Sequence, residues 1–122
     1  RDFVFIDDVV EATIAGIEKP EAAGEVFNVG YGKPVDVITV AKTLLSNYGK
    51  EVPLTISGNY RIGDIRHNYA DLSKISSKLS FQPVYDFDKG IREFCNWVQT
   101  QEIGSSRYDE SLQELKEKGL FK

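Results

Sequence analysis

The chain of 122 residues contains one cysteine, one histidine and no methionine. A single cysteine excludes a disulfide within the chain and a structural zinc site built from several cysteines. Cys95 stands beside Phe94 and near Trp97, a setting typical of a buried, unreactive thiol. The lone His67 has no second histidine and no patterned nucleophile, so neither a metal site nor a catalytic triad is indicated.

Long apolar runs and an excess of positive charge are also missing. No stretch approaches the roughly 18 apolar residues that cross a membrane. A net charge of −4 and a pI near 5.0 argue against nucleic-acid binding, which requires a basic face. We therefore expect neither a membrane nor a nucleic-acid partner, and the unpaired cysteine is consistent with a reducing, cytoplasmic setting.

Hydrophobic residues make up 41% of the chain, which indicates a globular domain of ordinary size. Strands alternate with helices in the predicted order, and this favours an α/β fold. The strands are few and short, so we expect an incomplete fragment with about five helices rather than a complete doubly wound sheet. The expected strands are 4–6, 25–29 and 52–56. The first expected helix begins after Asp8 and ends before Pro20. The other expected helices cover 37–48, 71–79, 86–101 and 108–118.

Acidic residues stand next to the first expected strand. Asp7 and Asp8 precede a helical pattern, and we predict that they cap it, which explains them more simply than a cation site that includes Asp2. The expected inward face of this helix consists of Val10, Ile14 and Ile17. For the helix that begins at Asp86, the residues expected to point inward are Phe87, Ile91, Phe94, Cys95, Trp97 and Val98.

Gly30 and Gly32 resemble the start of a dinucleotide-binding loop. That loop needs a third glycine, and Val35 occupies its position here. We interpret the segment as a structural turn that leads into the next helix.

Tyr85 and Lys89 match the Tyr-x-x-x-Lys spacing of short-chain dehydrogenases, in which the lysine activates a catalytic phenol. Asp86 is a predicted helix cap, which leaves Tyr85 outside the helix and off the face of Lys89. We therefore interpret the match as a coincidence and predict no catalytic residue; an altered enzyme that uses this pair is the alternative.

The segment RIGDIRH, 61–67, combines two arginines with an aspartate around Gly63. Guanidinium groups suit phosphate oxygens, and a carboxylate suits the paired hydroxyls of a ribose. Composition alone does not distinguish this anion site from a cluster of solvated charges, so both interpretations stay open.

Three blocks together resemble a known family in order and spacing. They are RDFVFIDDVV at 1–10, EVFNVGYGKP at 25–34 and RIGDIRHNYAD at 61–71. All three are similar to the C-terminal blocks of extended short-chain dehydrogenases, the NAD-dependent epimerase/dehydratase enzymes of nucleotide sugars, such as UDP-glucose 4-epimerase. The resemblance covers nearly the whole chain.

The resemblance implies a substrate site without catalytic, cofactor-binding or metal-binding residues of its own. Arg1 and Arg61 would contact the pyrophosphate of a UDP- or dTDP-hexose, Asp64 would hold the ribose hydroxyls, and Phe3 would line the nucleotide pocket. Arg66 and His67 match the motif and would have a supporting role.

The family's NAD-binding loop and catalytic Tyr-x-x-x-Lys helix would precede Arg1. We therefore expect residues 1–122 to be the C-terminal nucleotide-sugar-binding region of a longer protein, separated from its N-terminal Rossmann domain, inactive alone and prone to dimerise. A 4,6-dehydratase instead of an epimerase, or a small interaction domain without nucleotide affinity, are the alternatives. The sugar, the base and the choice between NAD and NADP stay open.

Overall fold

The computed structural model describes residues 1–102 and 104–122. Five α-helices and one 3₁₀ turn lie in this part of the chain, in agreement with the five expected helices. Their bounds are α1 Ile6–Glu18, η1 Pro20–Ala22, α2 Val37–Tyr48, α3 Ser73–Leu79, α4 Phe87–Gln99 and α5 Tyr108–Glu117. None of these helices has both the length and the apolar character needed to cross a membrane.

The three expected strands do not form in the described part of the chain, so this prediction was wrong. Residues 4–6, 25–29 and 52–56 have no strand partner there, and the β-pairing consists of one isolated antiparallel bridge between Arg61 and Phe121. The β-branched and aromatic residues of these segments favour strands. A strand also needs a neighbouring strand to pair with its backbone N–H and C=O groups, and the local pattern does not show whether one is present.

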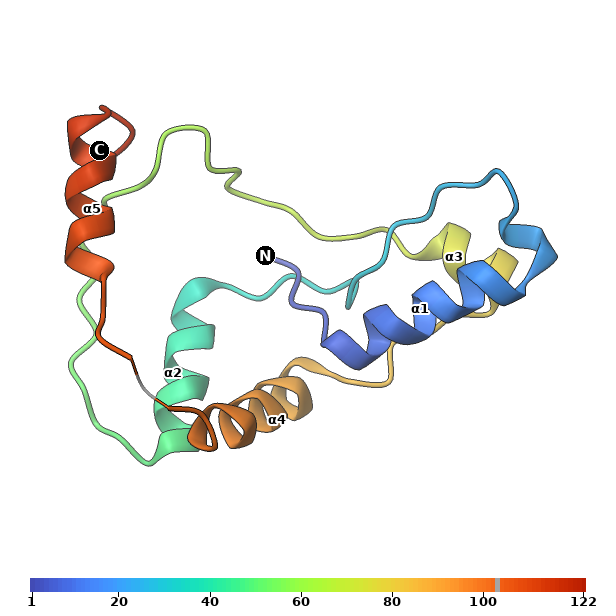
Figure 1. Ribbon diagram of the computed structural model, residues 1–122, viewed down its shortest axis with the longest axis horizontal. Helices are drawn as coiled ribbons and strands as arrows, with labels where there is room; N and C mark the ends of the chain where they lie inside the picture. Colours follow the sequence, from blue (N-terminus) through green and yellow to red (C-terminus); the bar gives the residue numbers. More distant parts are fainter. Residues whose placement is uncertain (103) are drawn as a thin grey trace.

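The helices lie along an open, bent arrangement (Figure 1). At one end α1 and α3 pack around η1, and in the middle α2 packs against α4. Helix α5 stands apart from the others in Figure 1. The small core lies under α1 and α3, and its members are Ala12, Ile75, Leu79 and Phe81.

Helices α2 and α4 begin where the sequence predicts. The side chain of Asp36 accepts a hydrogen bond from the backbone N of Thr39 at 2.8 Å, and Asp86 does the same for Lys89 at 2.8 Å. These carboxylates satisfy free N–H groups of the first helical turn. The thiol of Cys95 is buried, as expected.

Helix α1 differs from its prediction at its start. It begins at Ile6, so Asp7 and Asp8 lie inside the first turn and do not cap the helix. Asp8 is only 2% exposed, and its carboxylate accepts hydrogen bonds from the backbone N atoms of Val84 (2.8 Å) and Tyr85 (3.1 Å). A buried carboxylate requires such donors, so Asp8 fastens α1 to the segment that leads into α4.

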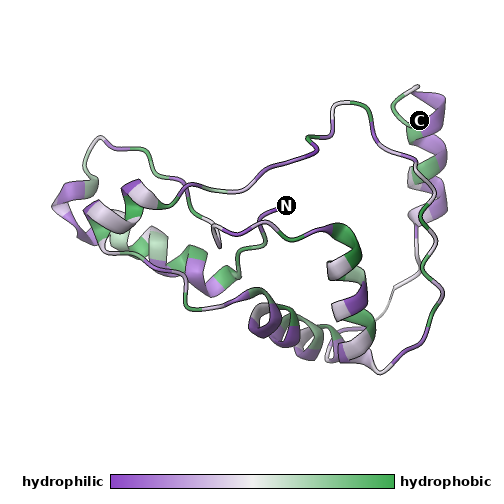
Figure 2. Cartoon of the chain, turned by 180° about the vertical axis from the view of Figure 1, so that it is seen from behind, coloured by the Kyte–Doolittle hydropathy of each residue, from purple (hydrophilic) through white to green (hydrophobic). Residues whose placement is uncertain are grey.

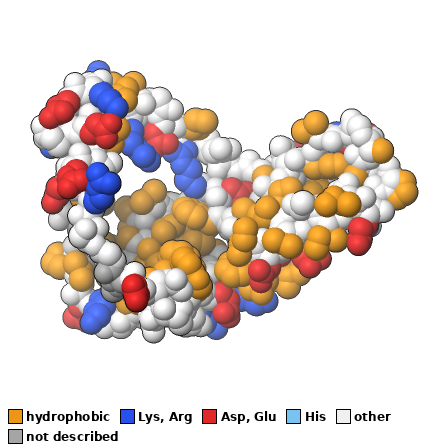
Figure 3. All heavy atoms as spheres, in the orientation of Figure 1, with side chains coloured by type: hydrophobic (Ala, Val, Ile, Leu, Met, Phe, Trp, Pro, Cys, Tyr) orange, Lys and Arg blue, Asp and Glu red, His pale blue; other side chains and the backbone are white. Residues whose placement is uncertain are grey.

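The predicted inward faces of α1 and α4 are partly wrong. In α1 the buried residues are Asp8 and Ala12, whereas Val10 and Ile14 are exposed and Ile17 is 80% exposed. In α4 the side chains of Phe94 and Trp97 are also exposed, and the face of α4 turned to the viewer in Figure 2 is hydrophilic. Figure 3 shows hydrophobic side chains gathered over the α1 end and around the hollow in the middle.

The carboxylate of Asp2 joins three segments. It accepts hydrogen bonds from the backbone N atoms of Tyr31 (2.7 Å), Gly32 (3.0 Å) and Ala70 (2.9 Å). Gly30 is buried against this carboxylate, and a Cβ atom there would lie 2.5 Å from Asp2 Oδ2 and 2.7 Å from the Cβ of Ala70. Glycine is therefore required at position 30 because two segments approach closely.

We predict that Gly30→Ala lowers the free energy of unfolding by about 1–3 kcal/mol, because the added methyl group displaces the Asp2 carboxylate or Ala70. The midpoint of urea unfolding measures the change. Gly16→Ala is the matched control: nothing lies within 4 Å of a Cβ there, and alanine favours the interior of α1. Equal stability of the two variants would contradict the role of Asp2.

Glu25 forms a surface clamp with α3. Its carboxylate pairs with Lys74 at 2.8 Å and with Lys78. Hydrogen bonds and charge attraction from these two lysines lower the pKa of Glu25 from 4.5 to about 2. The clamp therefore stabilises the fold above about pH 4.5 and is lost as the pH falls toward 2.

We predict that Glu25→Gln reduces stability near pH 6, and that the difference from the unchanged chain shrinks as the pH is lowered through about 4.5 toward 2. Because the clamp is largely exposed, the effect is small. Urea unfolding at a series of pH values measures it, with Glu21→Gln as the control for removing a nearby exposed carboxylate. A difference that stays constant over this range would contradict the lowered pKa.

Candidate functional site

Arg1 is held by its backbone. Its N atom donates to the carbonyl oxygen of Val35 at 2.8 Å, and its own carbonyl oxygen accepts from the N of Val35 at 2.8 Å. The adjoining Asp2 carboxylate fixes the next residue. The backbone of Arg1 is therefore held in place, and its guanidinium group forms an ion pair with Asp64.

Arg61 and Asp64 lie on one irregular segment, residues 57–69, which we call the site loop. Nη2 of Arg61 lies 3.9 Å from Oδ2 of Asp64, while the Arg1 guanidinium contacts Oδ1. A turn at Gly63 brings the N of Asp64 to within 3.1 Å of the carbonyl oxygen of Arg61. Three residues that the resemblance assigns to one substrate thus meet at one carboxylate, although Arg1 and Asp64 are 63 positions apart.

A hollow of about 560 Å³ opens beside this cluster. The residues that line it are Arg1, Gly58, Tyr60, Asp64, Ile65 and Arg66. Nη1 of Arg1 is enclosed and has no hydrogen-bond partner. An enclosed guanidinium N–H without an acceptor is costly, and an anionic ligand in the hollow would supply one. His67 does not line the hollow.

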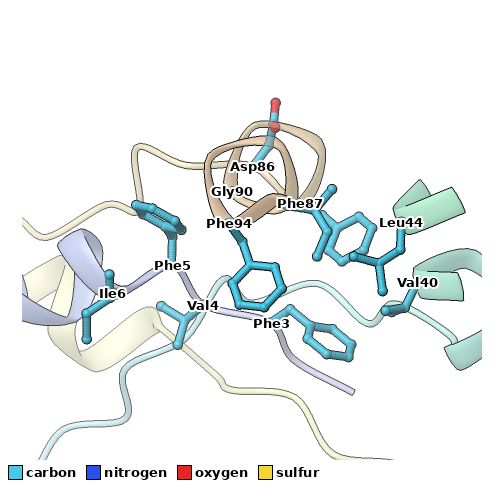
Figure 4. A pocket seen from close by; sticks show the side chains of 11 residues that line it. Phe3, Val4, Phe5, Ile6, Val40, Leu44, Asp86, Phe87, Gly90 and Phe94 are labelled. Atoms are coloured by element: carbon cyan, nitrogen blue, oxygen red, sulfur yellow. The ribbon is translucent and has the colours of Figure 1, made fainter. Parts of the chain in front are cut away.

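Phe3 lies elsewhere, in an apolar hollow of about 430 Å³ between the first residues of the chain, α2 and α4. Its ring packs edge-on against Phe87 with 5.7 Å between ring centres. Figure 4 shows Phe3, Val4 and Phe94 turned toward this space, whereas the carboxylate of Asp86 points away from it. The structure therefore separates Phe3 from the charged cluster.

The turn at Gly30 and Gly32 does not fit a dinucleotide phosphate. The backbone N–H groups of Tyr31 and Gly32 would have to face the phosphate, but the Asp2 carboxylate accepts both of them. An anion already occupies the turn, so a second anion would be repelled. This agrees with the structural interpretation of the two glycines and gives NAD no site in this turn.

Tyr85 lies outside α4, as expected, but the prediction that Lys89 is off its face was wrong. Nζ of Lys89 lies 3.8 Å from the ring centre of Tyr85. The Tyr85 hydroxyl donates to Asp7 at 3.2 Å, and this hydrogen bond, with burial, raises the pKa of Tyr85. Lys89 therefore makes a cation–π contact with the Tyr85 ring, and the group that contacts the hydroxyl is the carboxylate of Asp7.

Asp2 and Asp8 have roles that the sequence does not predict. The sequence suggests a cation site for Asp2 and a helix cap or a cation site for Asp8. Within the described residues, no group of three or more His, Cys, Asp or Glu side chains is placed to hold a metal ion. Neither residue belongs to a sequence motif that indicates amide binding. The glycines at 30 and 32 are the signal that could have indicated the role of Asp2. A glycine has no Cβ, so a carboxylate can lie close to the backbone there.

No family model matches the chain, but comparison with curated proteins gives relatives that include several nucleotide-sugar 4-epimerases. The dTDP-L-rhamnose 4-epimerase of Burkholderia thailandensis is 34% identical over 98 residues, which is 80% of this chain and 27% of the relative. The UDP-glucose 4-epimerase GEPI48 of Cyamopsis tetragonoloba is 30% identical over 91% of this chain and 32% of its own length. These relatives confirm the resemblance that the three sequence blocks indicate.

Solved structures agree with the relatives. The UDP-glucose 4-epimerase of Thermotoga maritima, solved with UDP-glucose, is 31% identical and superposes with a TM-score of 0.72 over 81% of this chain and 31% of its own. The UDP-N-acetylglucosamine 4-epimerase of Bacillus cereus, at 23% identity and a TM-score of 0.62 over 81% of this chain and 33% of its own, shares the fold. The chain thus spans about a third or less of the length of each of these proteins.

Proposed function

We propose that this chain, a homologue of nucleotide-sugar 4-epimerases, is the region of such an enzyme that binds the nucleoside diphosphate of its substrate. The observation that carries the proposal is the meeting of Arg1, Arg61 and Asp64 beside one hollow. The side chain of Arg61 is 65% exposed and that of Arg1 is 30% exposed, so a ligand in the hollow could reach both.

The charges of the cluster suit a diphosphate. Two guanidinium groups can each present a pair of N–H donors to phosphate oxygens, and Nη1 of Arg1 already lacks an acceptor. We propose that a bound diphosphate takes both arginines from Asp64, whose carboxylate then accepts hydrogen bonds from the ribose hydroxyls. Arg66, which lines the same hollow, adds positive charge in a supporting role.

Phe3 stays a proposed nucleotide contact. It follows Arg1 by two positions, and the open apolar hollow that it lines would accept a flat ring better than a charged group. Its hollow and the charged hollow have no lining residue in common, so Phe3 would contact another part of the nucleotide than the arginines and Asp64 do.

We further propose that residues 1–122 form the C-terminal region of the enzyme, and that an N-terminal Rossmann domain supplies NAD binding and the redox chemistry. Two observations support this. The chain spans about a third or less of its relatives, and α1 exposes apolar side chains that a further domain would cover. The energy of binding the nucleoside diphosphate in this region would position the sugar for the reaction in the Rossmann domain.

The substrate class follows from the relatives in outline only. We propose a UDP- or dTDP-linked hexose, because the names of the relatives include dTDP-L-rhamnose, UDP-glucose and UDP-glucuronate. Those relatives are 4-epimerases, which favours epimerisation over 4,6-dehydration. A role in carbohydrate biosynthesis in the cytoplasm is part of the same proposal.

We predict that the chain binds UDP or dTDP, and that Arg61→Ala weakens binding by about 1.4–2.8 kcal/mol, or roughly tenfold to a hundredfold, because charge-assisted hydrogen bonds to phosphate are lost. Calorimetric titration measures both affinities. Arg92→Ala on α4 is the control for removing an exposed arginine away from the hollow. Absence of nucleotide affinity would instead favour a small interaction domain.

We also predict no turnover when the isolated chain is mixed with NAD and a UDP-hexose, because the redox residues would lie in the other domain. Product analysis by chromatography, with an intact UDP-glucose 4-epimerase as positive control, measures turnover. Clear turnover would contradict the proposal, and its loss in Tyr85→Phe would then show that Tyr85 serves as an acid or base.

A further inference from the structure

We propose that the C-terminal arm, residues 108–122, is a positioning element that fixes Arg61 and Asp64 opposite Arg1. The inference rests on the proposed function for its ligand, a nucleoside diphosphate. Its structural basis is the bridge between the arm and the site loop, which joins residues 61 and 121. The arm contributes no side chain to the lining of the charged hollow, so its effect would pass through the loop.

The site loop has little packing of its own. Each of its residues, 57–69, is exposed, so no buried side chain anchors it. At its end Ala70 is held by the Asp2 carboxylate, and an ion pair with Arg1 holds Asp64. Exposed ion pairs order a backbone weakly. The orientation of Arg61 therefore depends on backbone hydrogen bonds.

Those hydrogen bonds come from the arm. Tyr60 and Lys122 exchange two of them, at 2.6 and 3.0 Å, and the N of Ile62 donates to the carbonyl oxygen of Leu120 at 2.9 Å. Within the described residues, the backbone–backbone hydrogen bonds between the site loop and the rest of the chain are all made by residues 120–122. The antiparallel register places Arg61 opposite Phe121, and a slip by one residue would turn the Arg61 side chain to the other face.

A left-handed glycine makes the arm return to the loop. Gly119 has φ 66°, and directly after it the N of Leu120 donates to the carbonyl oxygen of Leu115 at 2.9 Å. This closes the end of α5 and sends residues 120–122 back along the site loop. Since α5 stands apart from the other helices in Figure 1, the arm's main structural connection is with the loop that carries Arg61.

Gly119→Val tests the proposal, because a β-branched residue is strained at this φ. We expect the amides of Tyr60 and Ile62 to exchange hydrogen faster, and the affinity for UDP or dTDP to fall roughly tenfold as the loop loses its preorganisation. Gly119→Asn is the matched control, because asparagine tolerates a left-handed conformation, and it should retain both properties. Thermal unfolding of the α2–α4 region should be unchanged in both variants.

A double-mutant cycle separates positioning from a general structural effect. If the arm acts through Arg61, Gly119→Val should weaken binding much less in an Arg61→Ala background. Full additivity of the two effects would overturn the inference, as would unchanged amide exchange at Tyr60 and Ile62 or unchanged affinity in Gly119→Val.

Failure of the proposed function gives a different result. The unchanged chain would then bind neither UDP nor dTDP, and amide exchange alone would decide whether the arm holds the loop. Fast exchange at Tyr60 and Ile62 in the unchanged chain would overturn the inference, and protection that Gly119→Val removes would support it.

Discussion

Backbone amides of distant segments converge on two carboxylates near the start of the chain, and the rest of the structure depends on these hydrogen bonds. Asp2 joins the first residues to the turn at Gly32 and to Ala70, and Asp8 joins α1 to the segment before α4. Within the described residues no sheet performs this task. Hydrogen bonds from amides to a carboxylate are roughly twice as strong as those between neutral groups, so a few of them can replace a ladder.

The charged cluster follows from the same constraint. Because Asp2 accepts the amides of the glycine turn, that turn cannot receive a phosphate, and the neighbouring Arg1 becomes the cation available to a ligand. The backbone of Arg1 is fixed by Val35, so its guanidinium reaches Asp64 from a rigid position, while Arg61 arrives on an exposed loop. Two cations on either side of one carboxylate, one held through Val35 and the other on a loop held by residues 120–122, would suit an anionic ligand.

Local signals predicted the helices well, because caps and apolar periodicity act within a few residues. Asp36 and Asp86 begin their helices where the sequence indicates, and Gly49 ends α2 in the left-handed conformation. The predictions of three strands and of the inward side of α1 were wrong, since strand pairing and helix burial depend on partners that the local pattern does not specify. For the site, sequence motifs named Arg1, Arg61 and Asp64, whereas Asp2 and the arm act through backbone contacts that leave no motif.

The apolar surface bears on how tightly the site can hold an anion. Ile6 is exposed at the start of α1 and also lines the hollow of Phe3, so it joins that hollow to the exposed apolar side chains of α1. Phe3 follows Arg1 by two positions, so a domain that covered this area would come close to Arg1 and could exclude water near it. Coulomb attraction between guanidinium and phosphate strengthens as water is excluded, whereas exposed pairs contribute little. Closure by further protein would therefore strengthen the grip of Arg1 and Arg61 without adding any contact to the phosphate.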